Sequence, residues 1–134
     1  MNKRRLLKLA KLLRADAKNK KGIKFDLSVW GIVPLGEPVK LDCNTTACAV
    51  GLAVLSGAFK REGLGCTITA NIPMPTYRGE CGFRAVEEFF GIPEWLALHL
   101  FHKEEYPPAK RQGAVGERAV ATRIEGLCSR KTAP

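Results

Sequence analysis

Residues 41–57 read LDCNTTACAVGLAVLSG and predict the buried helix on which the fold depends. Thr45 or Thr46 suits the N-cap, because a threonine hydroxyl accepts a hydrogen bond from a free N–H group of the first helical turn. The residues from 47 to 55 are all small or apolar, so the helix should be buried on every side, and Gly57 ends it. We therefore expect cap and core positions in this segment, which are Thr45, Thr46, Cys48 and Gly51.

The composition bounds the class of protein. The chain has 134 residues, of which 46% are hydrophobic and 26% charged, and this favours one globular domain over residues 1–134 with its own core. No apolar run approaches the roughly 18 residues of a membrane span, and cations interrupt the leucines near the N-terminus, unlike in a signal peptide. Five cysteines, an odd number, favour reduced thiols. We expect a cytoplasmic protein without a cofactor.

The positive charge is concentrated at the N-terminus. Residues 1–24 contain ten lysines and arginines and a single acid, Asp16, whereas the rest of the chain has twelve residues of each sign. The formal net charge of +9 therefore belongs to the N-terminal element, and a uniformly basic protein is excluded.

Residues 2–18 are predicted to form an amphipathic helix within a basic element over residues 1–22. Its apolar stripe recurs at steps of three and four residues and consists of Leu6, Leu9, Ala10, Leu13 and Ala17. The cations provide the candidate partner-binding residues, which are Lys3, Arg4, Arg5, Lys8, Lys11, Arg14 and Lys18. Three interpretations stay open: contact with nucleic acid, contact with an anionic membrane surface or an acidic protein, and a merely solvated helix face.

The remaining sequence predicts further helices and little β-structure. Residues 25–33 suit a short strand or an extended loop. A hairpin is expected from residues 66–70 and 76–78, with its turn at 72–75. Helices are predicted at 83–90, 93–105 and 113–128, followed by a frayed tail at 129–134. The fold class is thus mainly α with minor β-structure: about five helices around a buried, central, Ala/Gly-rich helix, and one short β-hairpin.

Short motifs add a resemblance to this pattern. The string CNTTACAVG at residues 43–51 is followed by AVEEFFGI, by a helix carrying HLF and by a last helix carrying ATRI. In this order and spacing, residues 41–128 resemble a group of small uncharacterised bacterial and phage proteins with a C-G-T-x-x-C-x-x-G motif, although Asn44 stands where that motif has glycine. The resemblance implies a shared fold and a phage or mobile-element origin, and it implies no activity.

Cys43 is the candidate nucleophile of an alternative function, a cysteine-dependent hydrolase. If a helix begins at residue 45 or 46, its free N–H groups and its dipole favour the thiolate of Cys43. The order Leu41-Asp42-Cys43 is also similar to that of bacterial cell-wall peptidases related to papain. Such an enzyme needs a histidine base within hydrogen-bond reach. The sequence offers only His99 and His102, in a predicted helix, whereas those families carry the histidine in a strand, so we favour no catalytic residue.

The spacing of the metal-ligating residues does not indicate a metal site. Structural zinc sites usually combine two close cysteine pairs, and Cys43 and Cys48 form the only near pair in the sequence. His99 and His102 share a helix face, but histidines also suit the end of a helix for electrostatic reasons. No metal is therefore expected.

Acidic residues form a counterpart to the basic helix in the stretch 80–105. They are Glu80, Glu87, Glu88, Glu94, Glu104 and Glu105. The basic helix could meet this surface within one chain, or between two chains in a homodimer. The sequence as a whole predicts a small binding or accessory protein without catalysis, which contacts a protein or nucleic acid through its basic helix.

Overall fold

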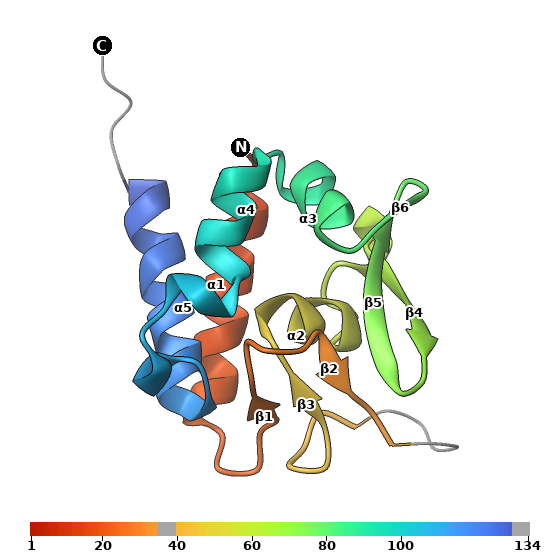
Figure 1. The fold of residues 1–134 in the computed structure, drawn as a ribbon. Coiled ribbons are helices and arrows are strands. Elements are labelled where there is room, and N and C mark those ends of the chain that lie inside the picture. Colours follow the sequence, from red (N-terminus) through yellow and green to blue (C-terminus); the bar gives the residue numbers. More distant parts are fainter. Residues whose placement is uncertain (35–39, 130–134) are drawn as a thin grey trace.

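A computed structural model describes residues 1–34 and 40–129 and shows a helix-rich α+β fold (Figure 1). Its described part contains five α-helices: α1 (Lys3–Lys18), α2 (Ala49–Leu55), α3 (Phe83–Phe90), α4 (Glu94–Phe101) and α5 (Gly113–Ser129). Short 3₁₀ helices are η1 (Lys60–Glu62), η2 (Lys103–Glu105) and η3 (Pro108–Lys110). The predicted helix-rich class is confirmed, and none of the described helices is long and apolar enough to cross a membrane.

Two small three-stranded sheets complete the fold. The first has the order β1-β3-β2, with β1 at Lys24–Phe25, β2 at Gly31–Ile32 and β3 at Thr46–Ala47. The second has the order β4-β5-β6, with β4 at Gly65–Thr69, β5 at Ile72–Tyr77 and β6 at Glu80–Cys81. In the first sheet, β3 pairs in parallel with β1 and antiparallel with β2.

Helices α1 and α5 form the largest helix–helix interface and run in opposite directions along one side of the molecule (Figure 1). The stripe predicted for α1 is buried at Leu6, Leu9, Ala10 and Leu13. The Asn2 side chain caps the helix, because its Oδ1 accepts a hydrogen bond from the Arg5 N–H at 3.0 Å. The predicted helix at residues 2–18 is confirmed.

The start predicted for the second helix is wrong. Helix α2 begins at Ala49, and its N-cap is Cys48, whose Sγ accepts a hydrogen bond from the Gly51 N–H at 3.3 Å. Thr46 belongs to β3 instead, and the Thr45 hydroxyl donates to the carbonyl of Lys40 at 2.6 Å. Neither threonine caps the helix, because the sheet formed with β1 and β2 holds this segment extended.

Helix α2 is nevertheless buried, as its small apolar sequence predicts. Its first five residues, from Ala49 to Ala53, lie in the core. The main neighbours of α2 are α1 and the strands β3, β4 and β5. At Gly51 an added Cβ would lie 1.8 Å from the carbonyl oxygen of Trp30, so the chain approaches the helix where only glycine fits.

The predicted hairpin exists, but its turn lies elsewhere. Ala70 and Asn71 connect β4 and β5 with φ angles of 51° and 68°, which are the left-handed values that a two-residue hairpin turn of type I′ requires. Residues 72–75, predicted as the turn, belong to β5, where Pro73 lies opposite Ile68. The prolines misled the prediction, because proline favours turns. Although β5 is the central strand, β6 pairs only with Thr76 and Tyr77, so Pro73 and Pro75 lie where β5 pairs with β4 alone.

The C-terminal half follows the sequence pattern closely. Helix α3 spans its predicted range and ends at Gly91, which has a left-handed φ of 63°. Helix α4 is shorter than predicted, since it ends at Phe101 and the chain continues as η2. Helix α5 covers the predicted segment, whereas residues 130–134 of the predicted frayed tail lie outside the described residues.

Candidate functional site

The cations of α1 form two groups that share Arg4, and the first group serves the fold. Arg4, Arg5 and Lys8 gather around Glu62 on η1. Arg5 Nε lies 3.0 Å from Glu62 Oε1, and Lys8 Nζ lies 3.9 Å from Oε2. The hydrogen bonds that Arg4 and Arg5 donate lower the pKa of Glu62, against the opposing effect of burial. These contacts fix the first half of α1 to η1.

Arg5, predicted as a partner-binding cation, has a structural role in the fold. Its Nη1 donates to the carbonyl of Phe89 at 2.7 Å, and its guanidinium lies 4.2 Å from the centroid of the Phe89 ring. The side chain is only 17% exposed. A cation held between a ring, a carbonyl and a carboxylate has no free surface to offer a partner.

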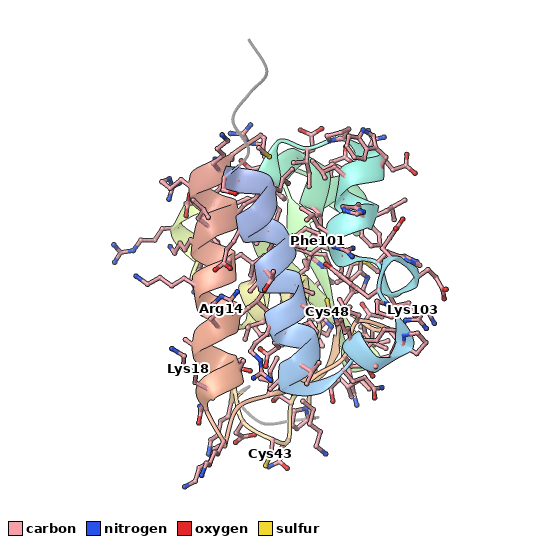
Figure 2. All side chains as sticks on the ribbon, turned by 90° about the vertical axis from the view of Figure 1, so that its left-hand side faces the viewer. Arg14, Lys18, Cys43, Cys48, Phe101 and Lys103 are labelled. Carbon is pink, nitrogen blue, oxygen red and sulfur yellow. The ribbon has the colours of Figure 1, made fainter. Side chains whose placement is uncertain are left out.

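Arg14 likewise serves the interface between α1 and α5. Its Nε and Nη2 donate to the two carboxylate oxygens of Glu125 at 2.9 Å and 2.6 Å, and Nη2 also donates to the Thr122 hydroxyl. Figure 2 shows Arg14 between the two helices. Because Nε and Nη2 of Arg14 are bound to Glu125 in this bidentate ion pair, these two groups are not available to an external partner.

The second group of cations is exposed along the outer face of α1. Lys3, Lys11 and Lys18 are exposed and form no ion pair within the described part of the chain. Arg4 touches Glu62, yet its side chain remains 65% exposed. Arg4, Lys11 and Lys18 are seven residues apart and therefore lie almost in line, over about 21 Å of helix. We call Lys3, Arg4, Lys11 and Lys18 the cationic row.

The basic surface continues beyond the helix. Lys20, Lys21 and Lys24 follow directly and are exposed, also without an ion pair among the described residues. Figure 2 shows Lys18 on the last turn of α1, at the end of the molecule where these residues follow. The single exposed large apolar side chain of α1 between its ends is Leu7, at 45%.

Among the described residues, none of the acids in the stretch 80–105 forms an ion pair with α1. Helix α1 forms its ion pairs with Glu62 and Glu125 instead. Two members of that stretch have other partners, since Glu104 pairs with Arg111 at 3.7 Å and Glu105 lies 3.8 Å from His99 Nδ1. The predicted contact within one chain is therefore wrong among the described residues, whereas contact between two chains stays a prediction.

The structure does not assemble the alternative hydrolase site. Cys43 is exposed in the loop before β3, so it precedes a strand and not a helix. It lies at the end of the molecule far from the labelled Phe101 and Lys103, which flank His102 in sequence (Figure 2). Both histidines line cavities to which Cys43 does not contribute. The helix terminus that should activate the Cys43 thiolate is thus absent, and so is its base.

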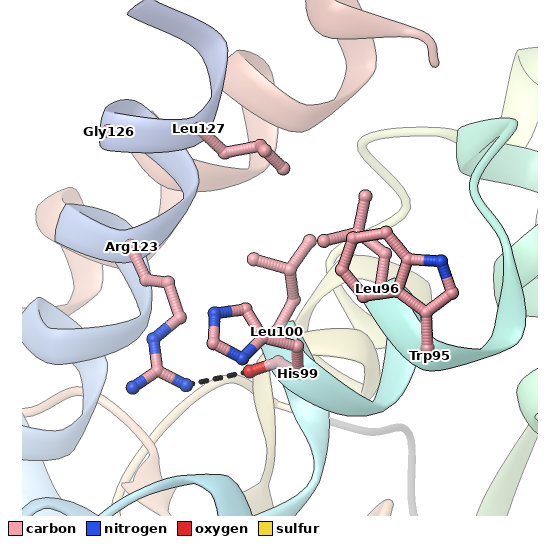
Figure 3. Close-up of a pocket in the computed structure, with 7 residues that line it drawn as sticks. All are labelled: Trp95, Leu96, His99, Leu100, Arg123, Gly126 and Leu127. Carbon is pink, nitrogen blue, oxygen red and sulfur yellow. Dashed lines mark hydrogen bonds between the residues drawn. The ribbon is translucent and has the colours of Figure 1, made fainter. Parts of the chain in front are cut away.

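His99 lines an apolar cavity between α4 and α5 (Figure 3). The cavity has a volume of about 430 Å³, and its other lining residues are Trp95, Leu96, Leu100, Arg123, Gly126 and Leu127. Arg123 donates to the carbonyl oxygens of His99 at 2.7 Å and Glu105 at 3.0 Å, and its guanidinium lies 3.9 Å from the Tyr106 ring centroid. Arg123 in the wall of this cavity therefore ties α5 to the end of α4 and to η2.

Cys48 and His102 both line a second cavity. Cys48 is buried, and this burial raises the pKa of its thiol to about 11. Its Sγ lies 3.5 Å from the carbonyl oxygen of Trp30, to which it donates. The Cys48 thiol is therefore protonated, caps α2 and donates to Trp30. It is a buried structural group, as predicted.

The sequence prediction missed a buried carboxyl pair. Glu117 on α5 is buried, and with Asp16 on α1 it leaves two carboxylate oxygens without a donor. Burial, and after it the neighbouring Asp16 carboxyl group, raise the pKa of Glu117 to about 9. The signal was present in the sequence, because Glu117 precedes Val120 and Ile124 on the apolar stripe of the last helix.

Among the described residues, no group of three or more histidine, cysteine or acidic side chains could hold a metal ion. Comparisons with protein-family models, with curated proteins and with solved structures find no match for this chain. The fold and the site therefore define a class only: a helix-rich α+β domain with a cationic helix face.

Proposed function

We propose that the protein is a small, non-catalytic accessory protein that binds the phosphate backbone of nucleic acid through the cationic row. The observation that carries the proposal is the division of the α1 cations, because Lys3, Lys11 and Lys18 are exposed without an ion pair among the described residues while Arg5 and Arg14 hold the fold. Cations that perform no structural work are available to an external anion.

Geometry favours phosphates over an acidic protein. The row spans about 21 Å, which equals the length of roughly six phosphates along one strand of B-form DNA. Its groups are mainly lysines, which act as flexible point charges and suit phosphates without a fixed orientation. Such contacts position a protein on nucleic acid without reading its sequence.

The proposal retains the rest of the sequence-based expectation. We retain the expectation of a cytoplasmic location, and the proposal of an origin in a phage or mobile element rests on the resemblance of the motifs alone. Neither a cofactor nor a catalytic residue enters the proposed function.

Charge reversal on the row tests the proposal with a matched control. Lys11→Glu/Lys18→Glu should weaken binding to a labelled random DNA duplex by at least about tenfold in fluorescence anisotropy at moderate salt. Lys103→Glu/Lys110→Glu changes the net charge equally but lies away from α1, and it should bind as the unmodified protein does. Equal losses in both variants, or no DNA binding by the unmodified protein, would overturn the proposal. Binding to an acidic protein but not to DNA would favour the other partner class.

A further inference from the structure

We propose that a second cavity, lined by an aromatic cluster and one lysine, binds a small aromatic carboxylate. The site is independent of the cationic row and of the proposed function. Its walls include Trp30, Cys48, Phe83, Phe101, His102 and Lys103, and its volume is about 360 Å³. This volume lies in the lower part of the range of about 300–1,000 Å³ typical of small-molecule sites.

The cavity is assembled from segments far apart in the sequence. Trp30 lies just before β2, Cys48 just before α2, Phe83 at the start of α3, and His102 directly after α4. Figure 2 labels Cys48, Phe101 and Lys103, which border it. Because four segments converge here, the shape of the cavity depends on the whole fold and on no single flexible loop.

Aromatic rings form one wall. The Trp30 and Phe83 rings have their centroids 4.9 Å apart at an interplanar angle of 52°, and the rings of Phe83 and His102 are 6.3 Å apart. All three residues are only half-buried, in contrast to the fully buried core rings of Phe59 and Phe90. Half-buried rings beside a cavity offer faces and edges on which another aromatic ring can pack.

The polar groups of the cavity favour an anionic ligand. Lys103 is half-buried and forms no ion pair within the described residues. His102 Nδ1 accepts a hydrogen bond from the Glu104 N–H at 3.1 Å, so in the neutral ring Nε2 carries the proton and is a donor. Within the part of the chain that the structure describes, the Lys103 ammonium group and the His102 Nε2–H have no acceptor, so both can donate to a bound anion.

Among the described residues, no acid forms an ion pair with Lys103 or His102. Asp26 accepts hydrogen bonds from the N–H and hydroxyl of Ser28 at 2.9 Å and 2.6 Å. Glu104 pairs with Arg111, and Glu105 lies beside His99. The Cys48 thiol is neutral, because burial raises its pKa to about 11. Aromatic walls and one lysine without an ion pair among the described residues together match an aromatic ring that carries a carboxylate.

The two tryptophans of the chain allow a direct test. Trp95→Phe leaves Trp30 as the only indole, so its emission reports on this cavity alone. Benzoate should change the emission saturably, and the neutral isostere benzamide should bind at least about tenfold more weakly, because it cannot pair with the lysine. The proposal would be overturned if neither ligand changed the emission saturably, or if benzoate and benzamide bound with equal affinity.

Two lysine variants locate the anion-binding group. In the Trp95→Phe background, Lys103→Gln should weaken benzoate binding about tenfold and abolish the preference over benzamide. Lys110→Gln removes the same charge outside the cavity and should leave both affinities unchanged. Circular dichroism of each variant verifies the fold. If Lys103→Gln retains the preference for benzoate, the assignment of the site is wrong.

Discussion

Glu117 on α5 and Asp16 on α1 face each other with their carboxyl groups in the interface between the two helices. Burial and the neighbouring Asp16 raise the pKa of Glu117 to about 9, so one proton is held between the two carboxyl groups at neutral pH. In the unfolded chain Glu117 has its ordinary pKa of about 4.3. Between these two values unfolding releases a proton, and the folded state therefore loses stability as the pH rises.

Glu117→Gln should stabilise the protein at neutral pH. The amide needs no proton to donate to Asp16, so the variant avoids a cost of about 4 kcal/mol that the pKa difference implies at pH 7. Urea unfolding from about pH 5 to about pH 8 should show a flatter dependence of stability on pH than in the unmodified protein.

Glu125→Gln is the matched control on the same helix. The hydrogen bond from Arg14 lowers the pKa of Glu125, so its contribution to stability is present above the ordinary pKa and is lost as the pH falls. This variant should be slightly less stable at neutral pH. If both variants shift stability in the same direction, the shared proton between Asp16 and Glu117 is not supported.

Gly51→Ala should be strongly destabilising. The new Cβ would lie 1.8 Å from the carbonyl oxygen of Trp30, a backbone atom that cannot move without disturbing the contact between Trp30 and α2. We expect a loss of about 3 kcal/mol or more in the free energy of unfolding.

Gly126→Ala provides the comparison for this glycine. Its Cβ would meet nothing within 4 Å on α5. Alanine has the higher helix propensity, so this variant should gain up to about 1 kcal/mol. Equal effects of the two substitutions in denaturant unfolding would show that Trp30 does not constrain Gly51.

Cys43 should react with iodoacetamide much faster than Cys48. Cys43 is exposed, whereas Cys48 is 3% exposed and has a thiol pKa of about 11. Peptide fragmentation in mass spectrometry separates the two positions, and denatured protein gives the rate of an unprotected thiol. Labelling of Cys48 in the folded protein at the rate of Cys43 would contradict its place as the buried cap of α2.

Nucleic-acid binding, if it follows the cationic row, should weaken steeply with salt. Each phosphate contact contributes about 0.9 to the slope of log K against log salt concentration. Lys11→Gln/Lys18→Gln should therefore reduce the magnitude of the slope by about 2, and Lys103→Gln/Lys110→Gln should leave it unchanged. A slope that none of these lysines affects would place the contact on another surface.

The sequence by itself determined the elements whose signals are local. Leu6, Leu9 and Leu13 recur at helical spacing and are buried in α1 as expected, because that period follows from helix geometry alone. Gly91 ends α3 for an equally local reason, since glycine adopts a left-handed φ without a steric cost. The burial of α2 also follows from its composition.

Tertiary structure decided everything that depends on distant partners. Thr46 became a strand residue because Lys24 and Ile32 pair with it, and no helix propensity records those partners. Arg5 and Arg14 differ in role from the exposed lysines because they bind Glu62 and Glu125, which lie 57 and 111 residues away in the sequence. The raised pKa of Glu117 depends on its burial, and the aromatic cavity depends on the convergence of distant segments. Both are properties of the folded chain and cannot be read from the sequence.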